Sequence, residues 1–302
     1  MTVNQIPFQE FLMLLRNQGL KVAIGPFNVR IHTHHQPLIK QLYMLYSHYR
    51  LVQDEIIEFH VRINTERSIR NPLRLNVRFL IDGQSPFESF PEEQALAVLE
   101  WGINLAIAVR VNHLLLLHSA VVEKKGAAIL FPAWPGSGKT TLCTALCHRG
   151  FRLFSDEFGL MDYQRGVIYP IPRLMPLKNE SIAVIRKLLP QAVIGQSIPN
   201  THKGTVAHVR PPEESMRLSE NTAKARWIIF PKWIAQAETQ LEPIADAEAF
   251  MLLASNAFNY EVLGAHGFRA VEQLVAQCDC YTLTYSDLDE VTTALHQLID
   301  ES

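Results

Sequence analysis

Residues 131–141 read FPAWPGSGKTT, and residues 155–157, which follow the next apolar run, read SDE. The first stretch differs from the Walker A pattern G-x-x-x-x-G-K-[ST] at one position, because Ala133 stands where the first glycine is expected. An alanine is tolerated there only where φ is negative. The stretch lies between an apolar run and a helical pattern, and backbone N–H groups at such a helix N-terminus can bind phosphate. The sequence therefore predicts a phosphate-binding loop.

The predicted loop offers the contacts that a nucleoside triphosphate and its metal ion require. Lys139 is expected to reach the terminal phosphates, and the Thr140 hydroxyl is expected to bind Mg²⁺. Glycines 136 and 138 permit close approach of the backbone to phosphate. ATP and Mg²⁺ are therefore the expected cofactors. The loop residues expected to bind them are Pro135, Gly136, Ser137, Gly138, Lys139, Thr140 and Thr141.

An acidic pair, Asp156 and Glu157, ends the strand that is predicted after the loop helix. Ligands of open α/β sheets bind at the carboxyl ends of the strands, so both side chains are candidates for the site. One carboxylate can face Mg²⁺ or its water shell while the other approaches an acceptor hydroxyl as a base. The alternative is a helix cap or a solvated turn.

The apolar periodicity divides the chain into two parts. Short continuous apolar runs beside the loop are typical of strands buried on both faces of an α/β sheet. Nearer the start of the chain, period-two alternation predicts an antiparallel sheet with helices. We therefore expect an α/β fold with an N-terminal α+β domain or sheet extension at 1–112 and a P-loop domain at 113–302. Residues 170–222 are expected to be mostly loops, with brief strand-like pieces such as GTVAHV starting at Gly204. The expected strands are 27–31, 55–63, 74–83, 114–122, 126–131, 151–154 and 227–231, and the expected helices are 37–49, 91–111, 140–149, 246–258 and 288–298.

The composition argues against several classes of protein. The 302-residue chain has a net charge of −2 and a pI near 6.6, which gives no electrostatic reason to expect nucleic acid or an anionic membrane as a partner. No N-terminal signal and no apolar run long enough to span a bilayer is visible, so we expect a cytoplasmic protein. The cysteines lack common zinc spacing and are expected to be reduced; they are Cys143, Cys147, Cys278 and Cys280.

Three stretches around the loop carry a family resemblance. They are HSAVV starting at His118, PGSGKTTL starting at Pro135 and HRGFRLFSDE starting at His148. In motif and spacing the chain resembles the HPr kinase/phosphorylase family, in its HPr-kinase-related branch, within the P-loop kinases shaped like PEP carboxykinase. The resemblance covers residues 113–300. It implies a PEP-carboxykinase-like P-loop core with the N-terminal antiparallel sheet and helices as an extension.

The resemblance also implies roles for individual residues. His118 would be an active-site histidine near the transferred phosphate, and Thr140 would hold Mg²⁺ in place of a serine. Glu157 would occupy the position of the catalytic base, where the family has aspartate. The extra methylene displaces the carboxylate, so Asp156 is the alternative base. Glu180 would supply a second carboxylate for Mg²⁺.

Two further stretches, PRLMPLKNE starting at Pro172 and GTVAHVRPP starting at Gly204, are similar to signatures of the same branch. They make Arg173, Lys178 and Arg210 candidates for binding phosphate charge, with solvated surface positions as the alternative. NAFNYEVLG, starting at Asn256, is also similar to the branch and is assigned to packing.

The expected function is an ATP- and Mg²⁺-dependent kinase that transfers a phosphoryl group to a hydroxyl, on a serine of a small protein or peptide. Phosphorolysis is conceivable by resemblance, and the resemblance also implies self-association as a homo-oligomer. Two alternatives stay open. One is a non-catalytic, nucleotide-binding regulatory protein, favoured by the missing glycine and the Asp-to-Glu change. The other is a kinase for a small metabolite.

Overall fold

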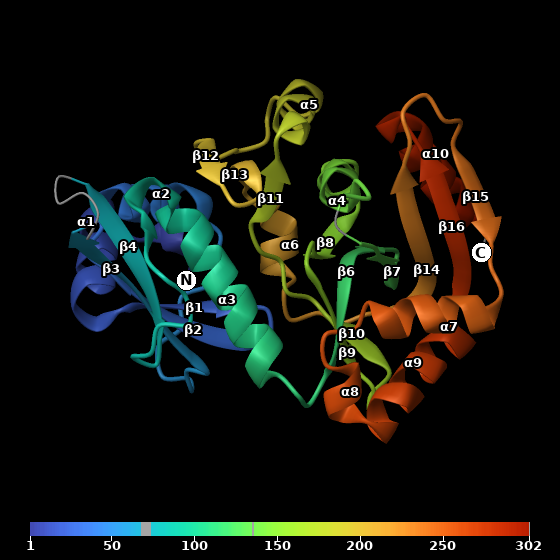
Figure 1. The fold of residues 1–302 in the computed structure, drawn as a ribbon, viewed down its shortest axis with the longest axis horizontal. Helices are drawn as coiled ribbons and strands as arrows, with labels where there is room; N and C mark the ends of the chain where they lie inside the picture. Colours follow the sequence, from blue (N-terminus) through green and yellow to red (C-terminus); the bar gives the residue numbers. More distant parts are fainter. Residues whose placement is uncertain (68–73, 135, 302) are drawn as a thin grey trace.

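The computed structural model describes residues 1–67, 74–134 and 136–301, so Pro135 of the predicted loop lies outside the described residues. Within those ranges the chain is a mixed α/β protein with three sheets. Figure 1 shows the chain passing from an N-terminal sheet through one long helix, α3 (Ala95–Arg110), into a larger sheet. The candidate site lies where these parts meet.

The N-terminal sheet has the strand order β1-β2-β3-β4-β5. Its strands are β1 (Leu20–Ile24), β2 (Phe27–Thr33), β3 (Phe59–Arg67), β4 (Leu75–Ile81) and β5 (Phe90–Pro91). Strands β2 and β3 run parallel, whereas the other neighbours are antiparallel. The prediction of an antiparallel sheet is therefore wrong at this pair. The physical reason is that α2 (Gln36–Leu45) crosses over between β2 and β3, and such a helical crossover joins parallel strands.

Two helices cover one face of this sheet. Period-two alternation directs residues such as Val29 and Val61 into one core with α2 and α3. Helix α3 approaches β4 so closely that a Cβ atom at Gly102 would lie 2.3 Å from the ring of Phe79. This glycine therefore allows the close packing of α3 on the sheet. Shorter elements precede these helices, namely η1 (Val3–Gln5), α1 (Phe8–Met13), η2 (Leu14–Gln18) and, before α3, η3 (Glu92–Gln94).

The larger sheet holds the predicted loop. Its order is β10-β9-β6-β7-β14-β16-β15, and β8 also pairs with β6. Strand β6 is antiparallel to β7, β8 and β9, while β7, β14 and β16 are mutually parallel. The strands predicted next to the loop are confirmed. The bounds are β6 (Leu115–Lys124), β7 (Ala127–Pro132), β8 (Arg152–Ser155), β9 (Phe158–Asp162), β10 (Val167–Tyr169), β14 (Lys224–Trp233), β15 (Gln240–Pro243) and β16 (Asp279–Tyr285).

Helices cover both faces of the larger sheet. Successive residues of β6 alternate between two cores, with Ala120 and Val122 in one and Val121 in the other. Helices α4 (Lys139–Cys147) and α10 (Leu288–Asp300) pack in the first core. Helices α7 (Asp246–Ser255) and α9 (Ala265–Gln277), joined by α8 (Tyr260–Leu263), pack in the second. The four cysteines are free and buried.

Residues 170–222 contain more regular structure than the sequence indicates. Strands β11 (Met175–Lys178), β12 (Ile198–Thr201) and β13 (Gly204–Val209) form a third sheet in the order β11-β13-β12. Helices α5 (Glu180–Leu188) and α6 (Glu213–Arg217) accompany it. The strands are short and their apolar residues, such as Met175 and Val209, pack into the core of α4. The strand-like piece expected at 204–209 is confirmed as β13. The other two strands are short and separated by proline and glycine, which gives little periodicity, so they were expected as loops.

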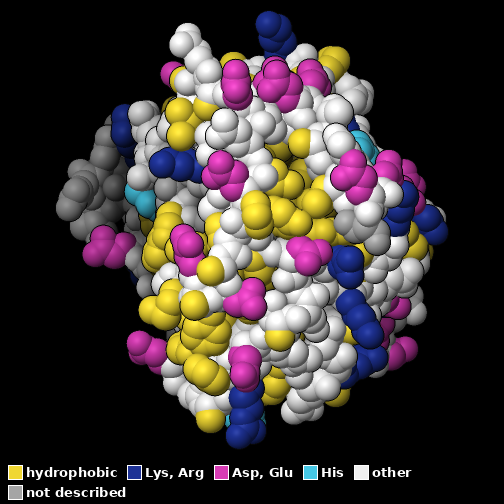
Figure 2. Space-filling model, turned by 90° about the vertical axis from the view of Figure 1, so that its right-hand side faces the viewer, with side chains coloured by type: hydrophobic (Ala, Val, Ile, Leu, Met, Phe, Trp, Pro, Cys, Tyr) yellow, Lys and Arg dark blue, Asp and Glu magenta, His cyan; other side chains and the backbone are white. Residues whose placement is uncertain are grey.

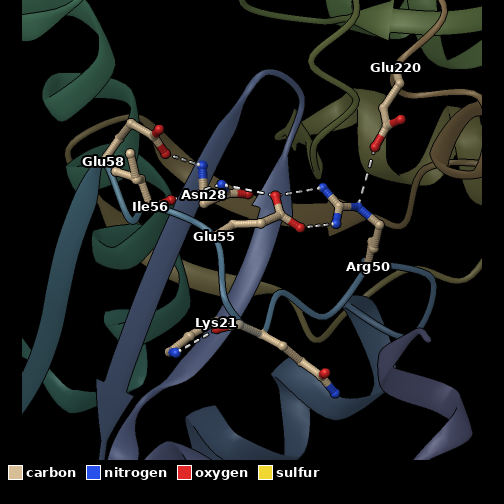
Figure 3. A network of polar contacts seen from close by, with 8 residues as sticks. Lys21, Asn28, Arg50, Glu55, Ile56, Glu58 and Glu220 are labelled. Carbon is tan, nitrogen blue, oxygen red and sulfur yellow. Dashed lines mark hydrogen bonds and ion pairs between the residues drawn. The ribbon is translucent and has the colours of Figure 1, made fainter.

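The N-terminal part and the larger sheet share a hydrophobic core. Leu116 of β6 and Phe158 of β9 belong to the same buried cluster as the residues under α2 and α3. At the surface, Arg50 forms ion pairs with Glu55 at 2.6 Å and with Glu220 at 3.5 Å (Figure 3). These side chains are well exposed, so each pair contributes about 1 kcal/mol at most. Only the pair with Glu220 joins the two parts, so this surface network contributes little to their association.

The surface on the side of the C-terminal helices mixes residue types. Figure 2 shows hydrophobic side chains on this face separated by acidic and basic ones. Exposed apolar side chains of these helices include Met251, Val262 and Phe268. In the described ranges, no helix combines the length and the apolar composition that crossing a membrane requires.

Candidate active site

The loop at 133–138 connects β7 to α4, as the motif predicts. Gly136 and Gly138 have φ angles of 94° and 86°, which glycine adopts without strain, while buried Ala133 is not among the residues with positive φ. A Cβ atom at Gly138 would lie 2.6 Å from the hydroxyl of Tyr285, whereas no atom of the described residues, apart from the chain neighbours, lies within 4 Å of one at Gly136. The first contact lets the loop pack against β16. The open space at Gly136 leaves room for a ligand.

The loop side chains predicted to bind phosphate and metal lie at the start of α4. Ser137, Thr140 and Thr141 are half-buried. The Ser137 hydroxyl has no hydrogen-bond partner among the described residues, and the carbonyl oxygen of Ser137 accepts from the N–H of Trp233 at 3.1 Å. The backbone of the loop is therefore held by β14, and the hydroxyl of Ser137 is available to a ligand.

Strand β6 brings the loop and the acidic pair together. Ser119 lies opposite Pro132, the last residue of β7, and Val121 lies opposite Ser155, the last residue of β8. Because β7 and β8 are both antiparallel to β6, they run in the same direction on either side of it. Their carboxyl ends therefore reach the same edge of the sheet, where the loop follows β7 and Asp156 follows β8.

Lys139 and Asp156 are buried charged residues with unsatisfied polar atoms. Their exposed fractions are 7% and 5%, and neither Nζ of Lys139 nor either carboxylate oxygen of Asp156 has a hydrogen-bond partner within the described part of the chain. Burial lowers the pKa of Lys139 and raises the pKa of Asp156 to about 7, and the opposite charge of each opposes the shift of the other. The nearby Thr140 hydroxyl also lowers the pKa of Asp156, although it makes no well-aligned hydrogen bond to the carboxylate. The hydrogen-bonding capacity of both groups is thus left for a ligand.

His118 lies within β6, near this pair. It pairs with Phe158 of β9, and its backbone N–H donates to the carbonyl of Asn256 at 2.7 Å. Burial, followed by the positive charge of Lys139, lowers the pKa of His118 to about 4, against the opposing charge of Glu157. The imidazole is therefore neutral near pH 7 and can form hydrogen bonds without carrying charge.

A narrow pocket lies between α3 and the acidic pair. Its lining includes Asp156, Glu157 and Trp101 of α3, around a cavity of about 30 Å³. This volume holds about one water molecule, so it fits only a small group. Lys178 and Lys203 also line the pocket, and their charges lower the pKa of His118. The pocket therefore places two lysine side chains in the same lining as the two carboxylates.

Arg173, a predicted phosphate ligand, is instead bound to the N-terminal part. Its guanidinium pairs with the carboxylate of Glu100 at 2.6 Å and donates to the side chain of Asn104. The hydroxyl of Tyr46 donates to the same carboxylate at 2.5 Å. Because Arg173 and Glu100 are both buried, their charges neutralise each other in the pocket wall. His208 is buried and lines the same pocket, and neither of its ring nitrogens has a hydrogen-bond partner in the part of the chain that the structure describes.

Two other predicted residues lie apart from this cluster. The guanidinium of Arg210 donates to the hydroxyl of Ser47 at 2.9 Å, just beyond the end of α2. Glu180 is exposed at the first position of α5 and is not among the charged groups that shift the pKa of Asp156. The structure does not bring either residue together with the loop.

The donors at the site fit a magnesium ion that is shared with a substrate. The described residues contain no group of three or more His, Cys, Asp or Glu side chains that could hold a metal by themselves. Mg²⁺ at phosphate sites uses one or two protein oxygens and completes its shell with phosphates and water. The unpartnered carboxylate of Asp156 and the hydroxyl of Thr140 meet this requirement.

Sequence reasoning missed the wall of the pocket that α3 supplies. Glu100 and Asn104 are polar residues one helical turn apart in a helix that is otherwise largely apolar, and Trp101 lies beside them. That spacing places the two polar side chains on one face, where they meet a buried cation. A buried polar pair in an apolar helix was therefore the signal available in the sequence.

Comparison with known proteins gives only a distant likeness. No protein-family model and no curated protein matches this chain. Among solved structures, the HPr(Ser) kinase/phosphatase from Coxiella burnetii is similar to it, in a match that covers 62% of this chain and 99% of that one, with 12% sequence identity and a TM-score of 0.26. A TM-score this low supports no argument about function, so the proposals below depend on the residues of this chain.

Proposed function

We propose that this protein is an ATP- and Mg²⁺-dependent kinase that transfers a phosphoryl group to a hydroxyl, with a serine of a small protein or peptide as the acceptor. One observation carries the proposal: Lys139 and Asp156 are buried, close and unpartnered beside the glycine loop. Unsatisfied buried charges are costly unless a ligand satisfies them. A triphosphate with its metal ion would satisfy both groups.

In this proposal the loop is a P-loop in a kinase core. The N–H groups at the start of α4 and the ammonium of Lys139 bind phosphate oxygens. Lys178 and Lys203 add positive charge where negative charge develops during transfer. Asp156 and Thr140 hold Mg²⁺, which when bound supplies charge neutralisation on the phosphates.

Glu157 is proposed as the base, because its charge acts on the pocket side of the site. The charge of Glu157 opposes the lowering of the pKa of both His118 and Lys203. Asp156 is instead the carboxylate whose pKa the Thr140 hydroxyl lowers, so Asp156 is assigned to the metal. Glu157 takes the proton of the acceptor hydroxyl, and the acceptor oxygen forms a bond to the γ-phosphorus. The bond from that phosphorus to the β–γ bridging oxygen breaks, and ADP leaves with its electron pair. Neutral His118 is available to hydrogen-bond the transferred group.

The pocket also gives residues 1–112 a role in the proposal. Trp101 and Asn104 of α3 face the acidic pair across the cavity of about 30 Å³. Only a narrow group, such as the hydroxymethyl end of a serine, enters a space of that size without rearrangement. We therefore propose that the N-terminal part forms the acceptor side of the site.

Labelled ATP tests the proposal directly. The protein is incubated with γ-labelled ATP, Mg²⁺ and a cell extract that contains proteins and metabolites. We expect label in a protein, at a rate that falls about 100-fold or more in Glu157→Gln because a base is removed. Glu180→Gln is the matched control, since that carboxylate lies outside the cluster, and it is expected to keep the activity. Label in a metabolite would instead indicate a small-metabolite kinase, and ATP binding without any transfer would indicate a regulatory nucleotide-binding protein.

A further inference from the structure

A second polar cavity lies on the N-terminal sheet, on the face that points away from α3. It has a volume of about 520 Å³, and its lining includes Arg30 and His32 of β2 and His60 and Arg62 of β3. These four residues alternate with buried apolar residues such as Ile31, which pack on the helix side. They therefore share the opposite face of the sheet.

The strand register places these basic residues next to one another. Arg30 lies opposite His60, and His32 lies opposite Arg62. Adjacent groups that carry or can gain positive charge destabilise a sheet unless an anion lies between them. The carboxylate of Asp82 also lines the cavity, but it is paired with Arg110.

Two of these side chains present unsatisfied polar atoms. Nε of Arg30 and Nδ1 of His32 are buried and have no hydrogen-bond partner among the described residues. Gly19 contributes to this arrangement, because a Cβ atom there would lie 2.6 Å from Cγ of Arg30, so the arginine stem packs directly on the glycine backbone. Burial and then the charge of Arg62 lower the pKa of His32. Neither arginine forms an ion pair with a carboxylate in the described part of the chain.

We propose that this cavity binds a small phosphate monoester. Two guanidinium groups can each bind phosphate oxygens through two N–H groups, and the two imidazoles offer further hydrogen bonds. The volume lies in the range of small-ligand sites rather than of an extended protein surface. The side chains of Asn17 and Asn64 at the lining can hydrogen-bond the hydroxyls of the ester group. This site is separate from the proposed kinase site and does not depend on it.

The test follows the imidazole signals of His32 and His60 by NMR. Inorganic phosphate, glycerol 2-phosphate and citrate are titrated at low ionic strength into the Lys139→Ala protein, whose other predicted phosphate site is disabled, and into the unmodified protein. We expect saturable shifts with both phosphates in both proteins. Arg62→Gln is expected to weaken binding about tenfold or more, since charge-assisted hydrogen bonds are lost.

Arg78→Gln is the matched control, because Arg78 lies on the same face of β4 and is already paired with Glu66 at 2.9 Å. It is expected to leave the affinity unchanged, while Arg30→Lys, which keeps the charge and the fold but loses the planar fork, is expected to weaken it. Unshifted imidazole signals would overturn the proposal. Equal losses in Arg62→Gln and Arg78→Gln, or binding of citrate without binding of glycerol 2-phosphate, would overturn it as well.

Discussion

Replacing Asp156 with asparagine tests whether this carboxylate is buried without a partner and thus free to bind a ligand. In the protein without nucleotide or metal, burial raises its pKa from 3.8 to about 7. The folded chain then binds the proton more tightly than the unfolded chain, so the free energy of unfolding falls as the pH rises from about 4 to about 7. At about 1.4 kcal/mol per pKa unit, the full loss is about 4 kcal/mol, and more than half of it falls between about pH 5 and about pH 8.

Asp156→Asn removes this loss because the amide does not ionise. The buried amide also lacks partners, which costs about 1–3 kcal/mol at every pH. We therefore expect the variant to be about as stable as the unmodified protein, or less stable, near pH 5. Its free energy of unfolding should rise by about 2–3 kcal/mol relative to that of the unmodified protein between about pH 5 and about pH 8. Reversible urea unfolding at several pH values, in a chelator and without nucleotide, measures this difference.

Glu157→Gln is the matched control for this experiment. Its charge is one of the causes that raise the pKa of Asp156, so removing it should reduce the pH-dependent loss only in part. If Asp156→Asn and the unmodified protein lose stability in parallel from about pH 5 to about pH 8, Asp156 is not a buried carboxylate with a raised pKa. The reasoning about the site would then be refuted.

Three more predictions follow from the same contacts. Thr140→Ala should raise the Mg²⁺ concentration needed for half-maximal activity while Thr141→Ala does not, and identical titration curves would remove Thr140 from the metal site. Arg173→Met should lower the free energy of unfolding, measured by urea denaturation, by about 3–5 kcal/mol, because it leaves the carboxylate of Glu100 buried without its cation. A decrease below about 1 kcal/mol would contradict the presence of this buried ion pair. The affinity for Mg-ATP should fall up to about tenfold for each pH unit below about 7, because protonation of Asp156 competes with binding of the metal. Calorimetry that finds the same affinity at pH 6 and pH 8 would exclude this carboxylate as a ligand.

The sequence was most informative where local rules decide the structure. The loop between β7 and α4 follows from glycine spacing and the apolar run before it, and the helix of the loop begins at Lys139 within one residue of the prediction. The edge at which Asp156 meets the loop also follows, because strand ends were predicted on both sides. These features depend on residues that lie close together in the chain.

The features that sequence reasoning missed depend on distant contacts. The parallel pairing of β2 with β3 depends on where α2 crosses the sheet. Arg173 was predicted from the sequence as a phosphate ligand, but its partner Glu100 lies 73 positions earlier, on the helix predicted at 91–111. Arg210 likewise meets Ser47 across 163 positions. Such pairs are fixed by tertiary packing, and local patterns carry no information about them.

Calorimetric titration of Mg-ATP tests the central claim most directly. The claim is that Lys139, buried and unpartnered at the start of α4, binds the phosphates of a nucleotide. We predict saturable heat with the unmodified protein and its loss in Lys139→Ala, with Lys178→Ala retaining measurable binding. Absence of heat with the unmodified protein, or the same affinity in Lys139→Ala, would contradict the account.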